Sequence, residues 1–336
     1  MVLVWLKLAI CLLIIAVAGR KLAGYGDVIA DKTGLGGAWV GITLLALATS
    51  LPELFTGISA VSFLNPPSPD LAIGDLLGSN AINIAILILL DLARQNGPVL
   101  ATVSPKDHLR TIRFSMALVT ICVVCILVDS IADFGLGWVG IYSPVIILIF
   151  LLMQRSIFRN ETNNGSETVE VMSKDSGPSL GQTYFRFAVV SGFVVAGGIW
   201  LAFVGDELAE ATGWGESFVG TIFLAFTTSF PEITISLSAV RMGSTDMALG
   251  NMLGSNMFNM ALIGITDIFY SNGSLLADVS ETHIATAVVV LAMSAIVIMG
   301  LHFRSWTRRF MRLSWYSIAL MAIYVIGIYV SFSCGD

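Results

Sequence analysis

The stretch Gly41-Ile42-Thr43-Leu44-Leu45-Ala46-Leu47-Ala48-Thr49-Ser50-Leu51-Pro52-Glu53 decides how the chain is organised. A long apolar run ends in two hydroxyl residues, a proline and a carboxylate. The same pattern returns at residues 220–232, which end in Thr228-Ser229-Phe230-Pro231-Glu232. Aligning residues 26–53 with residues 205–232 gives 14 identities in 28 positions. A repeat of this kind within hydrophobic sequence is typical of transporters built from two halves.

The composition indicates a polytopic, all-α membrane protein. Of the 336 residues, 56% are hydrophobic and 12% are charged, with a mean hydropathy of +0.87. Soluble domains carry about 25% charged residues. Ten apolar segments, most of them about 20 residues long and so able to cross a bilayer, are readable at residues 2–24, 37–62, 71–92, 110–128, 136–153, 184–208, 216–240, 247–269, 283–302 and 313–333.

The basic residues predict the orientation. The loops at residues 63–70, 129–135, 209–215 and 270–282 contain no Lys or Arg, and of the 17 basic residues only Lys7 falls on their side. Lys and Arg accumulate in cytoplasmic loops. We therefore expect a multi-pass protein of the plasma or cell membrane with both termini outside.

Five predicted helices per half is an odd number, so the second half enters the membrane with opposite polarity. This predicts ten transmembrane helices in two inverted-topology repeats, residues 1–153 and 184–336, joined by a polar cytoplasmic linker at residues 154–183. The site of such proteins lies near the midplane, where the halves meet.

Glu53 and Glu232 occupy matching positions of the repeat. An unpaired carboxylate inside a membrane costs several kcal/mol. Thr49, Ser50 and Glu53 share one helix face, and Pro52 frees a backbone carbonyl one turn earlier. Carboxylate, hydroxyl and carbonyl oxygens suit Ca²⁺ or Na⁺ rather than soft metals. The alternative interpretation is a kinked helix with a paired glutamate.

A second repeated motif lies at residues 74–83 and 250–259, where Gly-(Asp/Asn)-x-x-Gly-Ser-Asn-x-x-Asn occurs twice. Its Ser and Asn side chains, four residues apart, fall on one helix face. They are either neutral oxygen ligands or hydrogen bonds between helices, for which the glycines allow close contact.

With these motifs the chain resembles the cation/Ca²⁺ antiporter superfamily, in particular its Na⁺/Ca²⁺ exchanger branch. The resemblance implies a Ca²⁺/Na⁺ antiporter rather than an enzyme, without a cofactor beyond the transported ions, in which the first and sixth helices slide over a fixed core of eight. It implies ion ligands at Glu53, Glu232, Asn83 and Asn259, at Thr49, Ser50, Ser79, Thr228, Ser229 and Ser255, and at backbone carbonyls near Ala46 and Ala225.

Two positions depart from the branch. Asn259 stands where many of its members carry Asp, and Asp75 stands where Asn is usual. We expect Asp75, about two turns outside Asn83, either to draw cations into an outer vestibule or to serve as a helix N-terminal acid. Two central carboxylates predict electroneutral exchange of two monovalent ions per Ca²⁺.

Several alternatives stay open. Coupling to H⁺ or K⁺ instead of Na⁺ is the nearest. Gly24-Tyr25-Gly26-Asp27 fits an intramembrane aspartyl protease, and a cation channel would also place acids in a pore. No nucleic-acid partner is expected, and the oligomeric state is left open.

Overall fold

The computed structural model describes residues 1–33, 46–94, 97–128, 134–163, 179–241, 243, 245–303, 309–310 and 313–334, and these are mostly helical. The helices are α1 (Val2–Thr33), α3 (Ala46–Thr49), α4 (Leu51–Ser62), α5 (Pro69–Ala93), α6 (Pro105–Leu127), α8 (Tyr142–Asn163), α9 (Leu180–Thr212), α10 (Glu216–Val219), α11 (Ala225–Thr228), α12 (Phe230–Arg241), α13 (Thr245–Phe269), α14 (Thr282–His302) and α15 (Trp315–Cys334).

Short elements link the helices. A π-helical turn, η3 (Gly220–Leu224), joins α10 to α11, and 3-10 turns form η2 (Val99–Ala101) and η4 (Leu275–Ala277). Two antiparallel hairpins pair β1 (Gly135–Leu136) with β2 (Val139–Gly140) and β3 (Arg309–Phe310) with β4 (Leu313–Ser314).

A helix lies in every predicted apolar segment, but some boundaries were wrong. The segment predicted to begin at residue 136 starts with the β1–β2 hairpin, and its helix begins only at Tyr142. Helices α8 and α9 extend into the ends of the predicted linker, whose residues 164–178 lie outside the described part, as do residues 37–45 of the second segment. Hydrophobicity alone does not locate a helix start that tertiary hydrogen bonds decide.

The protein is a multi-pass helical membrane protein. Six described helices are long and apolar enough to cross a bilayer, or seven when the bent pair Glu216–Thr228 and Phe230–Arg241 counts as one span. Large apolar side chains are exposed along the outer helices, where lipid covers them. They include Leu3, Leu6 and Leu13 on α1, Leu148 and Leu151 on α8, Phe185 and Phe193 on α9, and Val325 and Tyr329 on α15.

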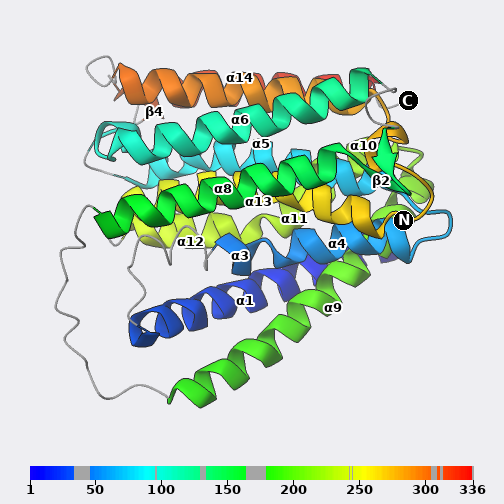
Figure 1. The fold of residues 1–336 in the computed structure, drawn as a ribbon, viewed down its shortest axis with the longest axis horizontal. Coiled ribbons are helices and arrows are strands. Elements are labelled where there is room, and N and C mark those ends of the chain that lie inside the picture. The colour runs from blue at the N-terminus through cyan, green and yellow to red at the C-terminus, as the bar shows by residue number, and fades with distance from the viewer. Residues whose placement is uncertain are drawn as a thin grey trace.

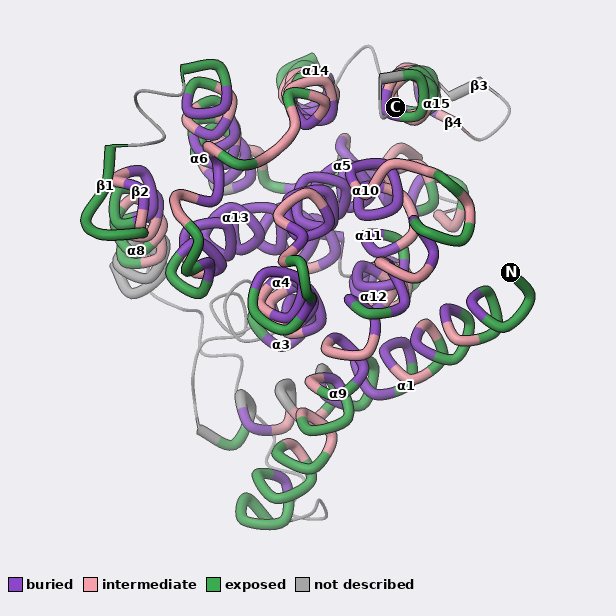
Figure 2. Tube along the Cα trace, turned by 90° about the vertical axis from the view of Figure 1, so that its right-hand side faces the viewer, coloured by how far each residue is buried: buried purple, intermediate pink, exposed green. Residues whose placement is uncertain are grey.

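Helices α5 and α13 form the centre of the bundle. Almost all of their residues are buried, and the other helices surround them (Figure 2). Helices α1 and α9 pack against each other along one side of the bundle, as Figure 1 also shows.

Buried aspartates fix the C-terminal ends of α5 and α13 in the same manner. Asp91 on α5 accepts hydrogen bonds from the Tyr316 hydroxyl (2.7 Å) and the Val99 amide (2.9 Å). Asp267 on α13 accepts from the Tyr142 hydroxyl (2.7 Å) and the Leu275 amide (2.7 Å). Asp91 also bonds to Ser314 next to α15, and Asp267 bonds to Gly140 next to α8. Because β4 and β2 lie at opposite ends of the bundle (Figure 1), α5 and α13 run in opposite directions.

The N-terminal ends of these two helices carry a second matched contact. Asp70 on α5 accepts hydrogen bonds from His283 (2.9 Å) and the Ser280 amide (2.8 Å). Asp246 on α13 likewise contacts His108 (3.0 Å) and accepts from the Ser104 amide (2.7 Å). Each central helix is therefore held at both ends by repeat-related side chains.

Replacing Asp267 by Ala should lower stability strongly. Its carboxylate accepts hydrogen bonds from two hydroxyls and two buried amides, and hydrogen bonds to charged groups contribute about 1.5–3 kcal/mol each. We expect the thermal unfolding temperature in detergent to fall by several degrees. The matched control is Asp278→Ala, which removes an exposed carboxylate that, among the described residues, accepts a hydrogen bond from the Tyr270 hydroxyl. Equal shifts for the two variants would contradict the role of Asp267.

Candidate functional site

Two helices break at matching positions of the repeat. Helix α3 ends at Thr49 and α4 begins at Leu51, with Ser50 between them; α11 ends at Thr228 and α12 begins at Phe230, with Ser229 between them. The second break bends the helix by 44°. A proline stands two residues after each serine. Because proline has no N–H, it cannot continue the backbone hydrogen bonds of the helix, which explains both breaks.

Each break places a glutamate in the first turn of the helix that follows it. Glu53 in α4 and Glu232 in α12 are completely buried. The positive end of the helix dipole favours a negative charge in this turn. Each break is therefore followed directly by a buried carboxylate.

Hydroxyl groups join the broken helices to the central pair. The Thr49 hydroxyl lies 3.5 Å from that of Ser255 on α13, and Ser255 donates to Glu232 at 3.3 Å. On the other side, the Thr228 hydroxyl lies 3.2 Å from that of Ser79 on α5. The structure thus brings together side chains that lie far apart in the sequence, and the two sides follow one pattern.

Backbone carbonyls predicted as ligands lie beside these hydroxyls. Thr49 is 3.1 Å from the Ala46 carbonyl, and Thr228 is 3.3 Å from the Ala225 carbonyl. Each threonine hydroxyl thus bonds to a carbonyl of its own helix, and the same two carbonyls also accept the Ser50 and Ser229 amides at 3.0 Å.

Many polar atoms of this core make no hydrogen bond to any described residue. They include both carboxylate oxygens of Glu53, Oε2 of Glu232, the hydroxyls of Ser50 and Ser229, and both side-chain polar atoms of Asn83 and Asn259. Buried polar groups in proteins are nearly always partnered. Buried atoms of this kind fit groups that bind water or cations.

Glycines bring α5 close enough to the second broken helix to form the cluster. A Cβ atom added at Gly78 would lie 2.2 Å from the Thr221 carbonyl oxygen, and one at Gly74 would lie 2.9 Å from the Ser217 oxygen. Small residues let membrane helices approach backbone to backbone. The π-helical turn η3 lies at this contact, and the sequence analysis did not predict it.

The structure places Asp75 differently from both expectations. Its side chain is completely buried, and it accepts a hydrogen bond from Thr228 at 2.9 Å. It is therefore not exposed in an outer vestibule. It is also not the acid of the helix N-terminus, because α5 begins at Pro69 and its first-turn acid is Asp70. The predicted helix start at residue 71 was two residues late.

Other asparagines of the repeated motif were not singled out from sequence. The Asn256 amide donates to the Asn80 carbonyl at 3.2 Å, so α13 and α5 contact each other directly through this motif. The available signal was the repeated Gly-Ser-Asn triplet itself.

The Asp27 side chain of the protease alternative lies outside the described residues.

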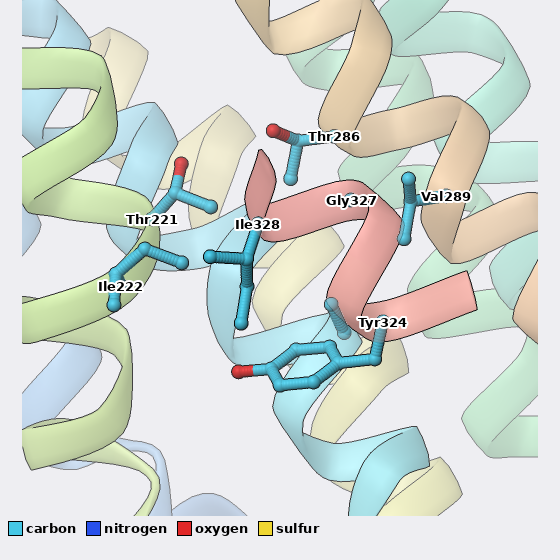
Figure 3. A pocket seen from close by; sticks show the side chains of 8 residues that line it. Thr221, Ile222, Thr286, Val289, Tyr324, Gly327 and Ile328 are labelled. Atoms are coloured by element: carbon cyan, nitrogen blue, oxygen red, sulfur yellow. The ribbon is translucent and has the colours of Figure 1, made fainter. Parts of the chain in front are cut away.

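A hollow elsewhere on the bundle contains none of the carboxylates. It lies between η3, α14 and α15, and Thr221, Thr286, Val289, Tyr324 and Gly327 line it (Figure 3). Its lining is largely apolar, which distinguishes it from the polar core.

The family model "Sodium/calcium exchanger protein" matches residues 3–155 and 183–333. The chain belongs to the sodium/calcium exchanger family. The Escherichia coli protein "Inner membrane protein YrbG" is 28% identical over 261 residues, which cover 76% of each chain. "Sodium/calcium exchanger MaX1" of Methanosarcina acetivorans is 33% identical over 125 residues, 37% of this chain and 33% of that one.

A solved structure of the sodium-calcium exchanger NCX_Mj, soaked with Na⁺ and Sr²⁺, has the same fold. Its TM-score is 0.63 over 98% of both chains, at 22% identity. The family and these exchangers are named for ion exchange and not for an enzymatic reaction. The expected resemblance to the Na⁺/Ca²⁺ exchanger branch is confirmed.

Replacing Gly78 by Ala should separate α5 from η3, because the nearest atoms belong to the Thr221 backbone and cannot move aside. Overpacking of this kind costs about 1–3 kcal/mol. We expect a lower unfolding temperature in detergent. Gly192→Ala is the matched control, since nothing lies within 4 Å of a Cβ atom there. An unfolding temperature for Gly78→Ala equal to that of the control would rule out the close contact.

Proposed function

We propose that the protein is a secondary antiporter that exchanges Ca²⁺ for Na⁺ across the membrane at one polar core site. The observation that carries this is the meeting of two broken helices, each with a buried glutamate, within a family of sodium/calcium exchangers. The site contains only oxygen and amide groups, which suits hard cations.

Glu53 and Glu232 would bind Ca²⁺ directly, and the amide oxygens of Asn83 and Asn259 would complete its shell. Ca²⁺ takes six to eight oxygen ligands in flexible geometry. Two carboxylates neutralise its charge, which a buried site requires. Further ligands are the hydroxyls of Thr49, Ser50, Ser79, Thr228, Ser229 and Ser255 and the carbonyls of Ala46 and Ala225, which suit Na⁺ as well.

The proposal includes ten membrane spans in two inverted repeats. Its support is the antiparallel course of α5 and α13, with matched aspartate contacts at both ends. Both ends of the chain lie at the same end of the bundle (Figure 1), as an even number of spans requires. The positive-inside rule assigns that end to the outside.

Alternating access would come from movement of α1 and α9 against the remaining helices. These two helices touch the breaks at repeat-related glycines. A Cβ atom at Gly19 of α1 would lie 2.5 Å from Cγ of Pro231, and one at Gly198 of α9 would lie 2.9 Å from the Pro52 carbonyl oxygen. Each of these two helices thus contacts the proline that precedes a site glutamate. A movement of the helix would therefore shift the glutamate as well.

The first test is ⁴⁵Ca²⁺ uptake into proteoliposomes loaded with Na⁺, with K⁺ or at acid pH. We expect uptake to require the outward Na⁺ gradient. In Glu53→Gln and Glu232→Gln one buried carboxylate ligand is lost, at about 3 kcal/mol or roughly 100-fold in apparent affinity. Exposed Asp278 provides the control variant Asp278→Asn, which should transport normally.

Three outcomes of this uptake experiment would contradict the proposal. Equal ⁴⁵Ca²⁺ uptake under K⁺ or H⁺ gradients would show that exchange is not coupled specifically to Na⁺. Normal uptake by Glu232→Gln would remove that glutamate from the site. Uptake that needs no counter-ion gradient would indicate a channel.

The second test concerns the glycines. Gly19→Ala and Gly198→Ala should slow exchange by roughly tenfold or more, because overpacking of about 1–3 kcal/mol hinders movement past the prolines. Ca²⁺ affinity, measured by titration calorimetry, should stay nearly unchanged. Gly24→Ala in α1 and Gly192→Ala in α9 are the controls, because a Cβ atom at either glycine would lie more than 4 Å from any atom of the described residues that it could meet. Equal exchange rates in all four variants would show that these glycine contacts do not affect transport.

A further inference from the structure

The β1–β2 hairpin exposes large apolar side chains at one end of the bundle. Phe134, Leu136 and Trp138 are 68%, 75% and 52% exposed. The hairpin lies at the edge of the bundle, beside α8 (Figure 2). Nε1 of Trp138 donates a hydrogen bond to the Ile268 carbonyl at 3.1 Å. The polar atom of the indole therefore has a partner within the protein, and the exposed remainder of the ring is apolar.

The same apolar surface continues over the C-terminal ends of α13 and α4. The bond from Trp138 joins the hairpin to α13, and the Ser62 hydroxyl at the end of α4 donates to the Phe269 carbonyl at 3.2 Å. We call the exposed large side chains of these three elements the apolar end patch; they are Phe63, Phe134, Leu136, Trp138, Ile268 and Phe269. Contiguous exposed apolar surface marks a site that contacts another protein or a membrane.

Hydrogen bonds fix the hairpin to the central helix α13. The Gly140 amide donates to Asp267 at 2.9 Å, and the Tyr142 hydroxyl donates to the same carboxylate at 2.7 Å. The Ile141 amide closes the base of the hairpin by donating to the Phe134 carbonyl at 2.8 Å. The apolar side chains are therefore held in place outside the bundle.

The second repeat contains a hairpin of the same kind with opposite chemistry. The two hairpins align through the tyrosines that follow them, which bond to the matching aspartates of α13 and α5. In this alignment Phe134 and Trp138 stand where the sequence of the second hairpin has Arg308 and Arg312. The fold of the hairpin therefore does not require large apolar side chains at these positions, and their presence in the first hairpin indicates a contact of its own.

Lipid is the partner that fits this surface. Helix α8 follows the hairpin directly, and its exposed side chains Val145, Leu148 and Leu152 form an apolar stripe that begins about one turn after Tyr142. Because lipid covers that stripe, the hairpin lies where the hydrocarbon gives way to the headgroups. Tryptophan is enriched at this level of membrane proteins, since its ring is amphipathic.

The charge of the surrounding loops favours burial of apolar area over attraction to phosphate. Residues 63–70, 129–135 and 270–282 contain no Lys or Arg. Binding to anionic headgroups depends on clusters of such residues. The contact therefore needs no anionic lipid.

We propose that the apolar end patch inserts into the interfacial region of the bilayer and anchors α13 there at a fixed depth. The hairpin supplies the most exposed side chains, and Asp267 transmits their position to the central helix. This anchoring does not depend on ion exchange.

The test places nitroxide spin labels on the full chain in phosphatidylcholine vesicles. The labelled variants are Phe134→Cys and Leu136→Cys in a Cys334→Ser background, because Cys11, Cys122 and Cys125 are buried. Glu281→Cys, an exposed acid at the N-terminus of α14, is the control. Electron paramagnetic resonance measures how often each label meets O₂, which dissolves in hydrocarbon, and a water-soluble nickel chelate.

We expect the labels at residues 134 and 136 to be reached several-fold more by O₂ relative to nickel than the label at residue 281. Their depth should resemble the about 5–10 Å by which interfacial apolar segments enter the bilayer. Nickel access equal to that of the control would place the hairpin in water and overturn the proposal. Low access of both reagents would show that a second copy of the chain covers the patch, which would also overturn it.

Discussion

Pro52 and Pro231 each remove an amide hydrogen inside a buried helix, and the polar core depends on that interruption. In a membrane every freed backbone group needs a partner within the protein. Side chains supply polar groups near the breaks. They are the hydroxyls of the threonines before the breaks, the serines of α5 and α13, and the glutamates after the breaks. Glycines of α5 then bring that helix close enough to take part.

The same interruption makes the core anionic. Glu53, Glu232 and Asp75 are completely buried, and the one basic residue in the helices that contain them is Arg241, in the last turn of α12. Under the proposed function cations would neutralise this core, so ion binding and closure of the bundle would be one event. The outer helices α1 and α9 lie against the prolines of the two breaks through Gly19 and Gly198.

The repeat in the sequence predicted the two broken helices with a glutamate after each break, because matching motifs occupy matching places. It could not predict the place of Asp75. That depends on how closely α5 approaches η3, which is a tertiary contact. The start of α8 was missed for the same reason, since contacts with Asp267 hold the hairpin before it. The count of ten spans, the side of the termini and the ion ligands stay predictions.

The most direct measurement of the central claim is anomalous X-ray scattering from crystals of this protein soaked with Sr²⁺, a stand-in for Ca²⁺ of the same charge. The account predicts one strong anomalous peak between the carboxylates of Glu53 and Glu232, removed when Na⁺ is raised to saturation. A peak away from both glutamates, or a peak between them that high Na⁺ leaves in place, would contradict a shared site at the two broken helices.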